Sequence, residues 1–154
     1  MKINVFSKCK LHPIQTSSVK KAVKAILALE KVESDEVSIY FVDIKTISSL
    51  HQEFFQDPTP TDCISFPVDG PKTGPEHSIL GEVFISPEVA ALYAKNHSID
   101  PREEVTLYLV HGLLHLLGYD DIDPKDRKIM RKKEKRCMHS LKQENLFIDY
   151  KHTS

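Results

Sequence analysis

The sequence is poor in glycine and cysteine, and it lacks tryptophan and long apolar runs. It holds 5 glycines and 3 cysteines in 154 residues. Cys9, Cys63 and Cys137 lie far apart without CxxC spacing, so they predict reduced thiols of a cytosolic protein and argue against a disulfide framework. No apolar run approaches the ~18 residues of a membrane span. The first residues, MKINVFSKCK, lack the apolar region of a signal peptide. These absences predict a soluble protein of the cytoplasm.

An excess of charge of either sign is also missing. The chain has 21 Lys and Arg against 22 Asp and Glu, for a formal net charge of -1. The molecule as a whole therefore has no strong attraction to nucleic acid or to a membrane, and any such contact must come from a local patch. A chain of 154 residues with 40% hydrophobic residues suits one domain, spanning 1–154. Its core is large enough to need no disulfide or metal.

Hydrophobic spacing predicts an α+β fold in which about four strands form a mixed sheet covered by helices. We expect the strands at 3–7, 36–43, 63–68 and 79–86, and helices at about 19–27, 44–55, 87–96, 101–117 and from 124 to the mid-140s. Thr16 or Ser17 is the expected N-cap of the first helix, and Asp100 that of the helix that opens at Pro101. Residues 57–62, which include Pro58 and Pro60, must form a loop.

The stretch HGLLHLLGYDD, residues 111–121, places two histidines in a run of leucines. Residues i and i+4 share one face of a helix, so His111 and His115 can aim both rings at one point. Gly118 offers a left-handed stop, and a carboxylate from Asp120 or Asp121 can then swing back as a third ligand. Two imidazoles and one carboxylate leave the fourth position of a tetrahedral Zn²⁺ for water, as in catalytic sites.

The alternative is that the two histidines are polar surface and the aspartates a solvated turn. The leucines around the histidines favour a buried helix, in which imidazoles need partners, and this supports the metal site. The zincin motif HExxH is a near match. However, its glutamate, the usual general base, is replaced here by Gly112. A peptidase of that type would need its base from elsewhere.

HGLLHLLGYDD resembles the signature of the YbeY family of metal-dependent endoribonucleases, which act in ribosomal RNA maturation and ribosome quality control in bacteria. The family pattern is His-Gly-x-Leu-His-Leu-x-Gly-Tyr-Asp-His, and every fixed position matches except the last, Asp121. PTDCISFP (60–67) and LGEVFIS (80–86) are similar to two further family motifs in the same order. The resemblance spans residues 37 to 135.

The resemblance implies a ligand set and a cleft. It makes His111, His115 and Asp121 the ligands of one Zn²⁺, since the third family ligand stands ten residues after the first histidine. Asp120 would then orient one of the imidazoles. No general base is identified. Asp62 and Ser65 are candidates for lining the cleft, although a loop N-cap and a strand surface explain them equally well.

The segment KDRKIMRKKEKR, residues 125–136, is strongly basic and begins four residues after Asp121. Such a run is usually a solvated helix face. Its excess of positive charge beside the metal motif also suits phosphate contact. We therefore predict RNA binding by four of its residues: Lys128, Arg131, Lys132 and Lys135. The implied partners are single-stranded RNA, ribosomal RNA and the ribosome, with no membrane and no DNA.

Three hypotheses for the function follow. The first is a zinc-dependent hydrolase, a single-strand endoribonuclease of ribosomal RNA maturation. The second is a metallohydrolase of another class, peptidase-like or acting on small molecules, and Gly112 counts against its peptidase form. The third is a non-enzymatic ribosome-associated factor with a structural or vestigial metal. Phe55 keeps the third open, because the family commonly carries at that position an arginine thought important for activity.

Overall fold

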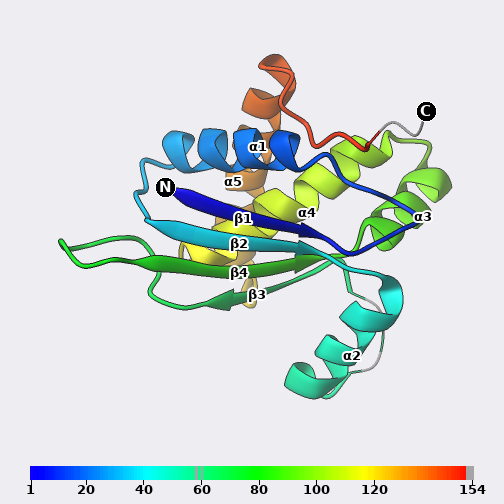
Figure 1. Cartoon of the computed structure of the whole chain (residues 1–154), viewed down its shortest axis with the longest axis horizontal. Coiled ribbons are helices and arrows are strands. Elements are labelled where there is room, and N and C mark those ends of the chain that lie inside the picture. The colour runs from blue at the N-terminus through cyan, green and yellow to red at the C-terminus, as the bar shows by residue number, and fades with distance from the viewer. Residues whose placement is uncertain (58, 60, 152–154) are drawn as a thin grey trace.

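One sheet organises the chain in the computed structural model, which describes residues 1–57, 59 and 61–151 (Figure 1). The elements are β1 (Lys2–Ser7), α1 (Thr16–Leu29), β2 (Glu36–Phe41), α2 (Ile44–Phe55), β3 (Cys63–Pro67), β4 (Ile79–Ile85), α3 (Pro87–His97), α4 (Pro101–Leu116) and α5 (Pro124–Gln143). The strand order is β1-β2-β4-β3. β1, β2 and β4 are parallel and β3 is antiparallel to β4, so the predicted mixed four-stranded α+β fold is confirmed.

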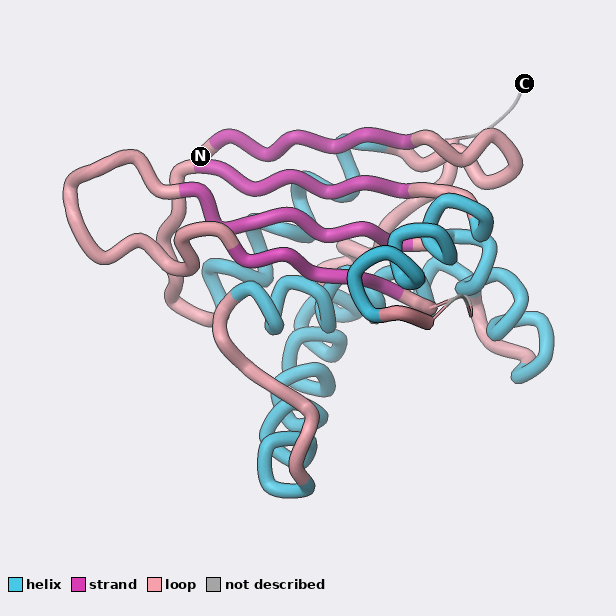
Figure 2. Tube along the Cα trace, turned by 90° about the horizontal axis from the view of Figure 1, so that it is seen from below, coloured by secondary structure: helices cyan, strands magenta, loops and turns pink. Residues whose placement is uncertain are grey.

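The two faces of the sheet are covered unequally. Figure 1 shows α1, α4 and α5 on one face and α2 on the other, and Figure 2 shows the four strands side by side from below. Alternate strand residues such as Val37, Ile39 and Phe41 are fully buried against the larger helical layer, as the two-residue period of a strand requires. The opposite face carries a smaller cluster around Ile47 of α2. The main core therefore lies between the sheet and α1, α4 and α5.

α4 lies unusually close to the sheet. A Cβ built on Gly112 would be 2.5 Å from Val83 Cγ1 of β4, which real side chains do not tolerate. The Ser65 hydroxyl of β3 donates a hydrogen bond of 2.9 Å to the Gly112 carbonyl oxygen. Glycine at this point of the helix leaves room for the branched side chain of Val83, which packs directly on the helix backbone. The contact fixes which side of α4 faces away from the sheet.

The ends of α4 agree with the prediction. The Asp100 carboxylate accepts from the backbone N–H of Arg102 at 2.9 Å, which is the expected N-cap, and Pro101 opens the helix. After the helix, Gly118 adopts a φ of 102°. That left-handed conformation turns the chain sharply, so residues 119–121 return toward the helix that they have just left.

The start of α1 differs from the prediction. The N-cap is Gln15, and its side chain makes no capping hydrogen bond, whereas Thr16 or Ser17 was expected. The Ser18 hydroxyl donates to the Gln15 carbonyl at 2.7 Å and accepts from the Asp149 N–H at 2.9 Å. The C-terminal segment therefore takes part in the hydrogen bonds at the start of this helix, and such a contact between distant residues cannot be read from the local sequence.

Strand β2 is also shorter than predicted. It ends at Phe41, and Asp43 becomes the N-cap of α2 by accepting from Thr46 N–H at 2.8 Å. Of the loop expected at 57–62, Pro58 and Pro60 lie outside the described residues. The three cysteines are free in the structure. Within the described part of the chain, none of the helices combines the length and the apolar character that crossing a membrane demands.

We predict that the protein folds without a bound metal. The core between the sheet and α1, α4 and α5 is formed by apolar side chains, and a chain of this size does not rely on an ion as a zinc finger does. Removal of metal with a chelator should leave the far-UV circular dichroism spectrum nearly native, with a modest decrease in melting temperature. Loss of the helical spectrum on chelation would contradict this prediction.

Candidate metal centre

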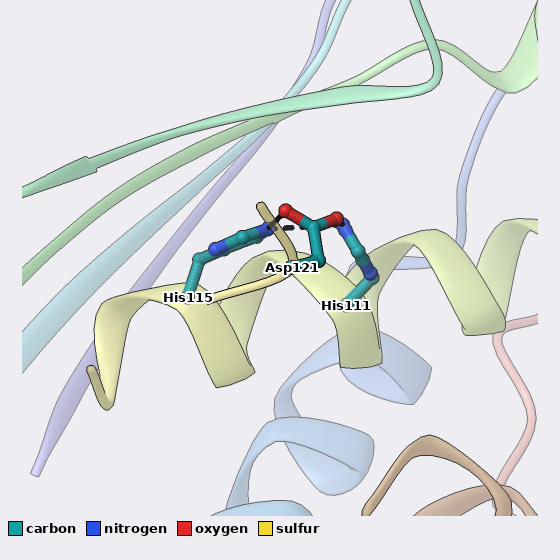
Figure 3. A group of neighbouring side chains, drawn as sticks. All are labelled: His111, His115 and Asp121. Carbon is teal, nitrogen blue, oxygen red and sulfur yellow. Dashed lines mark hydrogen bonds and ion pairs between the residues drawn. The ribbon is translucent and has the colours of Figure 1, made fainter. Parts of the chain in front are cut away.

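The side chains of His111, His115 and Asp121 converge on one point (Figure 3). The two Nε2 atoms lie 3.0 Å apart. The Asp121 oxygens are 3.5 Å from His111 Nε2 and 3.7 Å from His115 Nε2. Ligand atoms about 2.0–2.1 Å from a tetrahedral Zn²⁺ would be separated by about 3.3 Å. The observed spacings lie on both sides of this value, so the three groups fit a single ion of that kind.

Local structure explains the convergence. His111 and His115 occupy successive turns of α4 on the side that Gly112 keeps away from β4. After Gly118, the N–H of Tyr119 donates to the Leu114 carbonyl at 3.1 Å and holds the returning chain against the helix. Asp121 is thereby brought over both imidazoles, and about a fifth to a quarter of each imidazole remains exposed, 22% and 25%.

Asp120 has a different contact from the one implied by the resemblance. Its carboxylate accepts a hydrogen bond of 2.7 Å from the backbone N–H of Asp121, the next residue. A short acidic side chain in a tight turn readily binds its neighbouring backbone. Asp120 therefore shapes the turn that presents Asp121, and its expected contact with an imidazole stays a prediction.

Glu134 of α5 makes the contact with an imidazole. Its Oε1 lies 3.1 Å from Nδ1 of His111, and only 12% of its side chain is exposed. This hydrogen bond is the main cause that raises the pKa of His111, while burial of the ring acts in the opposite direction. When Nε2 faces a metal, Nδ1 carries the ring proton and donates it to Glu134. Sequence reasoning missed Glu134, although an acidic residue inside a basic run was a signal.

Two clefts adjoin the ligand group. The first cleft, of about 470 Å³, is lined by both histidines and by Phe55, Ser65 and Tyr119, among others. The second cleft, of about 420 Å³, has the following residues in its lining: Asp62, Tyr93, Glu104, Tyr108, His111, Asp121, Arg127, Arg131 and Glu134. His111 belongs to both linings. The ligand group therefore lies on the boundary between two hollows.

The candidates Asp62 and Ser65 lie on opposite sides of this boundary. Asp62 lines the second cleft, and its carboxylate accepts from the Cys63 N–H at 2.7 Å. Ser65 lines the first cleft and donates its hydroxyl proton to Gly112. Both side chains are thus engaged with backbone, and a chemical role for either one stays a prediction.

Phe55 stands at the end of α2 with 56% of its surface exposed. Its ring lines the first cleft together with His51, 5.5 Å away between ring centroids. The position at which the family commonly carries an arginine therefore faces the same hollow as the two histidines. An apolar ring there adds no positive charge to this cleft.

The predicted RNA-binding residues are all exposed on α5, but they face different directions. Arg131 lines the second cleft, while Lys128, Lys132 and Lys135 lie farther round the helix. Arg127, which the prediction left out, lines the same cleft, and its Nη1 donates to the Ile122 carbonyl at 2.9 Å. Only one side of the basic helix thus reaches the candidate site.

Comparisons with known proteins agree on one family. A family model described as "Endoribonuclease YbeY" matches residues 4–142. A Protochlamydia amoebophila protein named endoribonuclease YbeY is 53% identical over 126 residues, which cover 82% of this chain and 83% of that protein. A Chlamydia felis protein with the same name is 41% identical over 151 residues, 96% of each chain.

A solved structure is similar in fold. The solution structure of a Thermotoga maritima protein superposes with a TM-score of 0.65 and 22% identity, and covers 92% of this chain and 90% of its own. At this identity the likeness concerns the fold alone.

We predict that metal content depends strongly on Asp121 and Glu134. It should depend far less on Asp120. Asp121→Ala should lose the ion or bind it much more weakly, because one of three ligands disappears, whereas Asp121→His should retain it through a third nitrogen. Glu134→Gln should lower metal affinity about 10–100-fold. Asp120→Ala should have a smaller effect. Metal per chain, measured after dialysis, decides this: loss in Asp120→Ala with retention in Asp121→Ala would place the third ligand one residue earlier.

Proposed function

The chain belongs to the YbeY family of endoribonucleases, and from this membership and its His-His-Asp group we propose that it is a metal-dependent endoribonuclease of single-stranded RNA. The observation that carries the proposal is the convergence of His111, His115 and Asp121 between two open clefts. We propose further that residues 1–154 form one such unit, which acts in the cytoplasm on ribosomal RNA and associates with the ribosome.

We propose zinc as the metal, with one ion per chain. Two nitrogens and one oxygen at the observed spacings suit Zn²⁺, and a carboxylate ligand also accepts harder ions. When bound, the ion would supply positive charge to a phosphodiester and acidity to a water molecule. The protein's own part is to hold the geometry: Glu134 keeps the His111 ring in place, and Asp120 shapes the turn of Asp121.

Packing at Gly112 argues against the peptidase alternative. In the zincin motif this position carries the glutamate that acts as general base. Here any side chain would collide with Val83, because even a Cβ would lie 2.5 Å from Val83 Cγ1. The side of α4 that would present such a base is the side packed on β4. A peptidase would need another base, whereas the exposed cations of α5 favour a polyanionic substrate.

We predict that the metal-loaded protein degrades single-stranded RNA and leaves casein intact. Addition of a chelator should stop RNA loss, and replacement of the metal should restore it, because the ligand group needs an ion to act on phosphate. Gel electrophoresis of both substrates, with and without chelator, measures this. Asp121→Ala is a suitable inactive control.

The same assay separates the alternatives. Loss of casein that is sensitive to chelator would overturn the ribonuclease in favour of a peptidase. No loss of either substrate by a metal-loaded, folded protein would favour the non-enzymatic ribosome-associated factor. Phe55→Arg then provides a direct test of the family's arginine position, since that side chain would add a cation to the first cleft.

We predict that the basic face of α5 binds RNA through its charge. A variant with glutamate at Lys128, Arg131, Lys132 and Lys135 should bind RNA more weakly and show a flatter dependence of affinity on salt. These side chains are exposed, so folding should survive. The matched control carries glutamate at four other exposed lysines: Lys2, Lys8, Lys10 and Lys45. Equal losses in both variants would show that only net charge matters, and would refute a binding face on α5.

A further inference from the structure

If the protein cleaves RNA as proposed above, the positions of the two clefts indicate the path of the RNA strand across the ligand group. A phosphodiester held at the ligand group has one nucleotide on each side of it along the strand. His111 lines both clefts, and Asp121 lines the second. Each cleft is therefore a candidate for one of the two flanking nucleotides. The lining of the second cleft offers separate groups for the base and for the phosphate of one nucleotide.

An aromatic ring forms one wall of the second cleft. Tyr93 of α3 lines it and has 44% of its surface exposed. The ring stacks on the imidazole of His97, with 3.9 Å between centroids and 15° between planes. His97 Nδ1 in turn lies 2.9 Å from the Tyr93 carbonyl oxygen, so the pair is held on the helix. A ring fixed in this way loses little freedom when a base stacks on it, and such stacking accepts any base.

Charged side chains of both signs line the second cleft, and they differ in burial. Glu104 is 7% exposed, and burial raises the pKa of its carboxyl group. Arg127 and Arg131 are exposed. Buried carboxyl groups suit the amino and hydroxyl groups of a nucleoside, and exposed guanidinium groups suit phosphate oxygens. The volume of about 420 Å³ is within the range of small-molecule sites.

The two arginines differ in their freedom to bind phosphate. Arg127 already donates to the Ile122 carbonyl and so supports the turn after Asp121. Arg131 lies one helical turn further and lines the same cleft. Arg131 is therefore the better phosphate contact, because its use does not disturb the turn that carries a metal ligand.

A second row of aromatic rings is less suited to the bases of a strand held at the ligand group. Phe6, Tyr40 and Phe84 form a row across the sheet face opposite the main core. Their rings stack on one another at 4.8 and 4.6 Å between centroids, and none of the three lines either cleft beside the ligand group.

We propose that the second cleft binds the nucleotide next to the scissile phosphate, with its base on Tyr93 and its outer phosphate on Arg131. Removal of the Tyr93 ring should then weaken RNA binding roughly 5- to 150-fold, the range for loss of one stacked base. Tyr93→Phe should bind like the wild type, because stacking needs the ring and not the hydroxyl. Leu92→Ala is the matched control: Leu92 is 55% exposed on the same helix and its loss should have no effect.

An abasic scan tests the stacking contact directly. The probe is a fluorescein-labelled nine-nucleotide single-stranded RNA in which one base at a time is removed, and binding to metal-loaded protein is followed by fluorescence anisotropy. In the wild type, one position should lose affinity more than the others. In Tyr93→Ala, the loss at that position should vanish, since the base has no ring left to contact. A scan that is unchanged by Tyr93→Ala would overturn the proposal.

The phosphate contact has its own readout. Arg131→Gln should lower the slope of log affinity against log salt by about 0.7, the value for one phosphate contact on a single strand. An unchanged slope would remove Arg131 from the subsite. Gel analysis of the same samples reports cleavage separately. RNA that stays intact while the abasic scan changes as expected would refute the ribonuclease function and keep the nucleotide site. RNA that is cleaved while the scan is the same in wild type and Tyr93→Ala would refute the nucleotide site alone.

Discussion

The close approach of α4 to the sheet at Gly112 is the contact on which the rest of the site depends. Because a Cβ there would lie 2.5 Å from Val83 Cγ1, any residue other than glycine would force the helix or the Val83 side chain of β4 to shift. Ser65 adds a hydrogen bond to the same peptide unit. This packing sets the rotation of α4 about its axis. His111 and His115 lie close to Gly112 on the helix, and they line the first cleft together while His111 also lines the second.

Helix α5 holds the ligand group from the side away from the sheet contact at Gly112, through His111 and the turn at Tyr119. Two successive residues, Lys133 and Glu134, contact the two ends of the segment 111–119. Glu134 binds His111, and Lys133 Nζ lies 5.3 Å from the centre of the Tyr119 ring. Lys133 also pairs at 3.3 Å with Glu30 of the α1 end, a side chain only 2% exposed. The ligand turn is thus tied through α5 to α1. Movement of α5 would alter the His111 ring and the Tyr119 turn together, so the helix is part of the site as well as a basic surface.

Sequence patterns predicted those features that depend on neighbours along the chain. Strand alternation, the Asp100 cap, the Gly118 turn and the i, i+4 histidine pair are all local, and each is present in the structure. Features that depend on contacts between distant segments could not be predicted. Glu134 meets His111 from another helix, and Asp149 satisfies the start of α1 across most of the chain. From the sequence, Gly112 stands out only because the zincin motif has glutamate at that position. The packing of Val83 of β4 against Gly112, which explains the glycine, is visible only in the structure.

The near-zero net charge does not conflict with a polyanionic substrate. At physiological ionic strength, charges interact over about 8 Å, so a phosphate senses the nearest side chains and little of the remaining surface. Around the ligand group those side chains are of both signs: Arg127 and Arg131 are exposed, whereas Glu104 and Glu134 are largely buried. A uniformly basic surface would bind any strand in any register. Cations that stand beside the candidate metal ligands would instead favour a register that brings a phosphodiester to the ligand group.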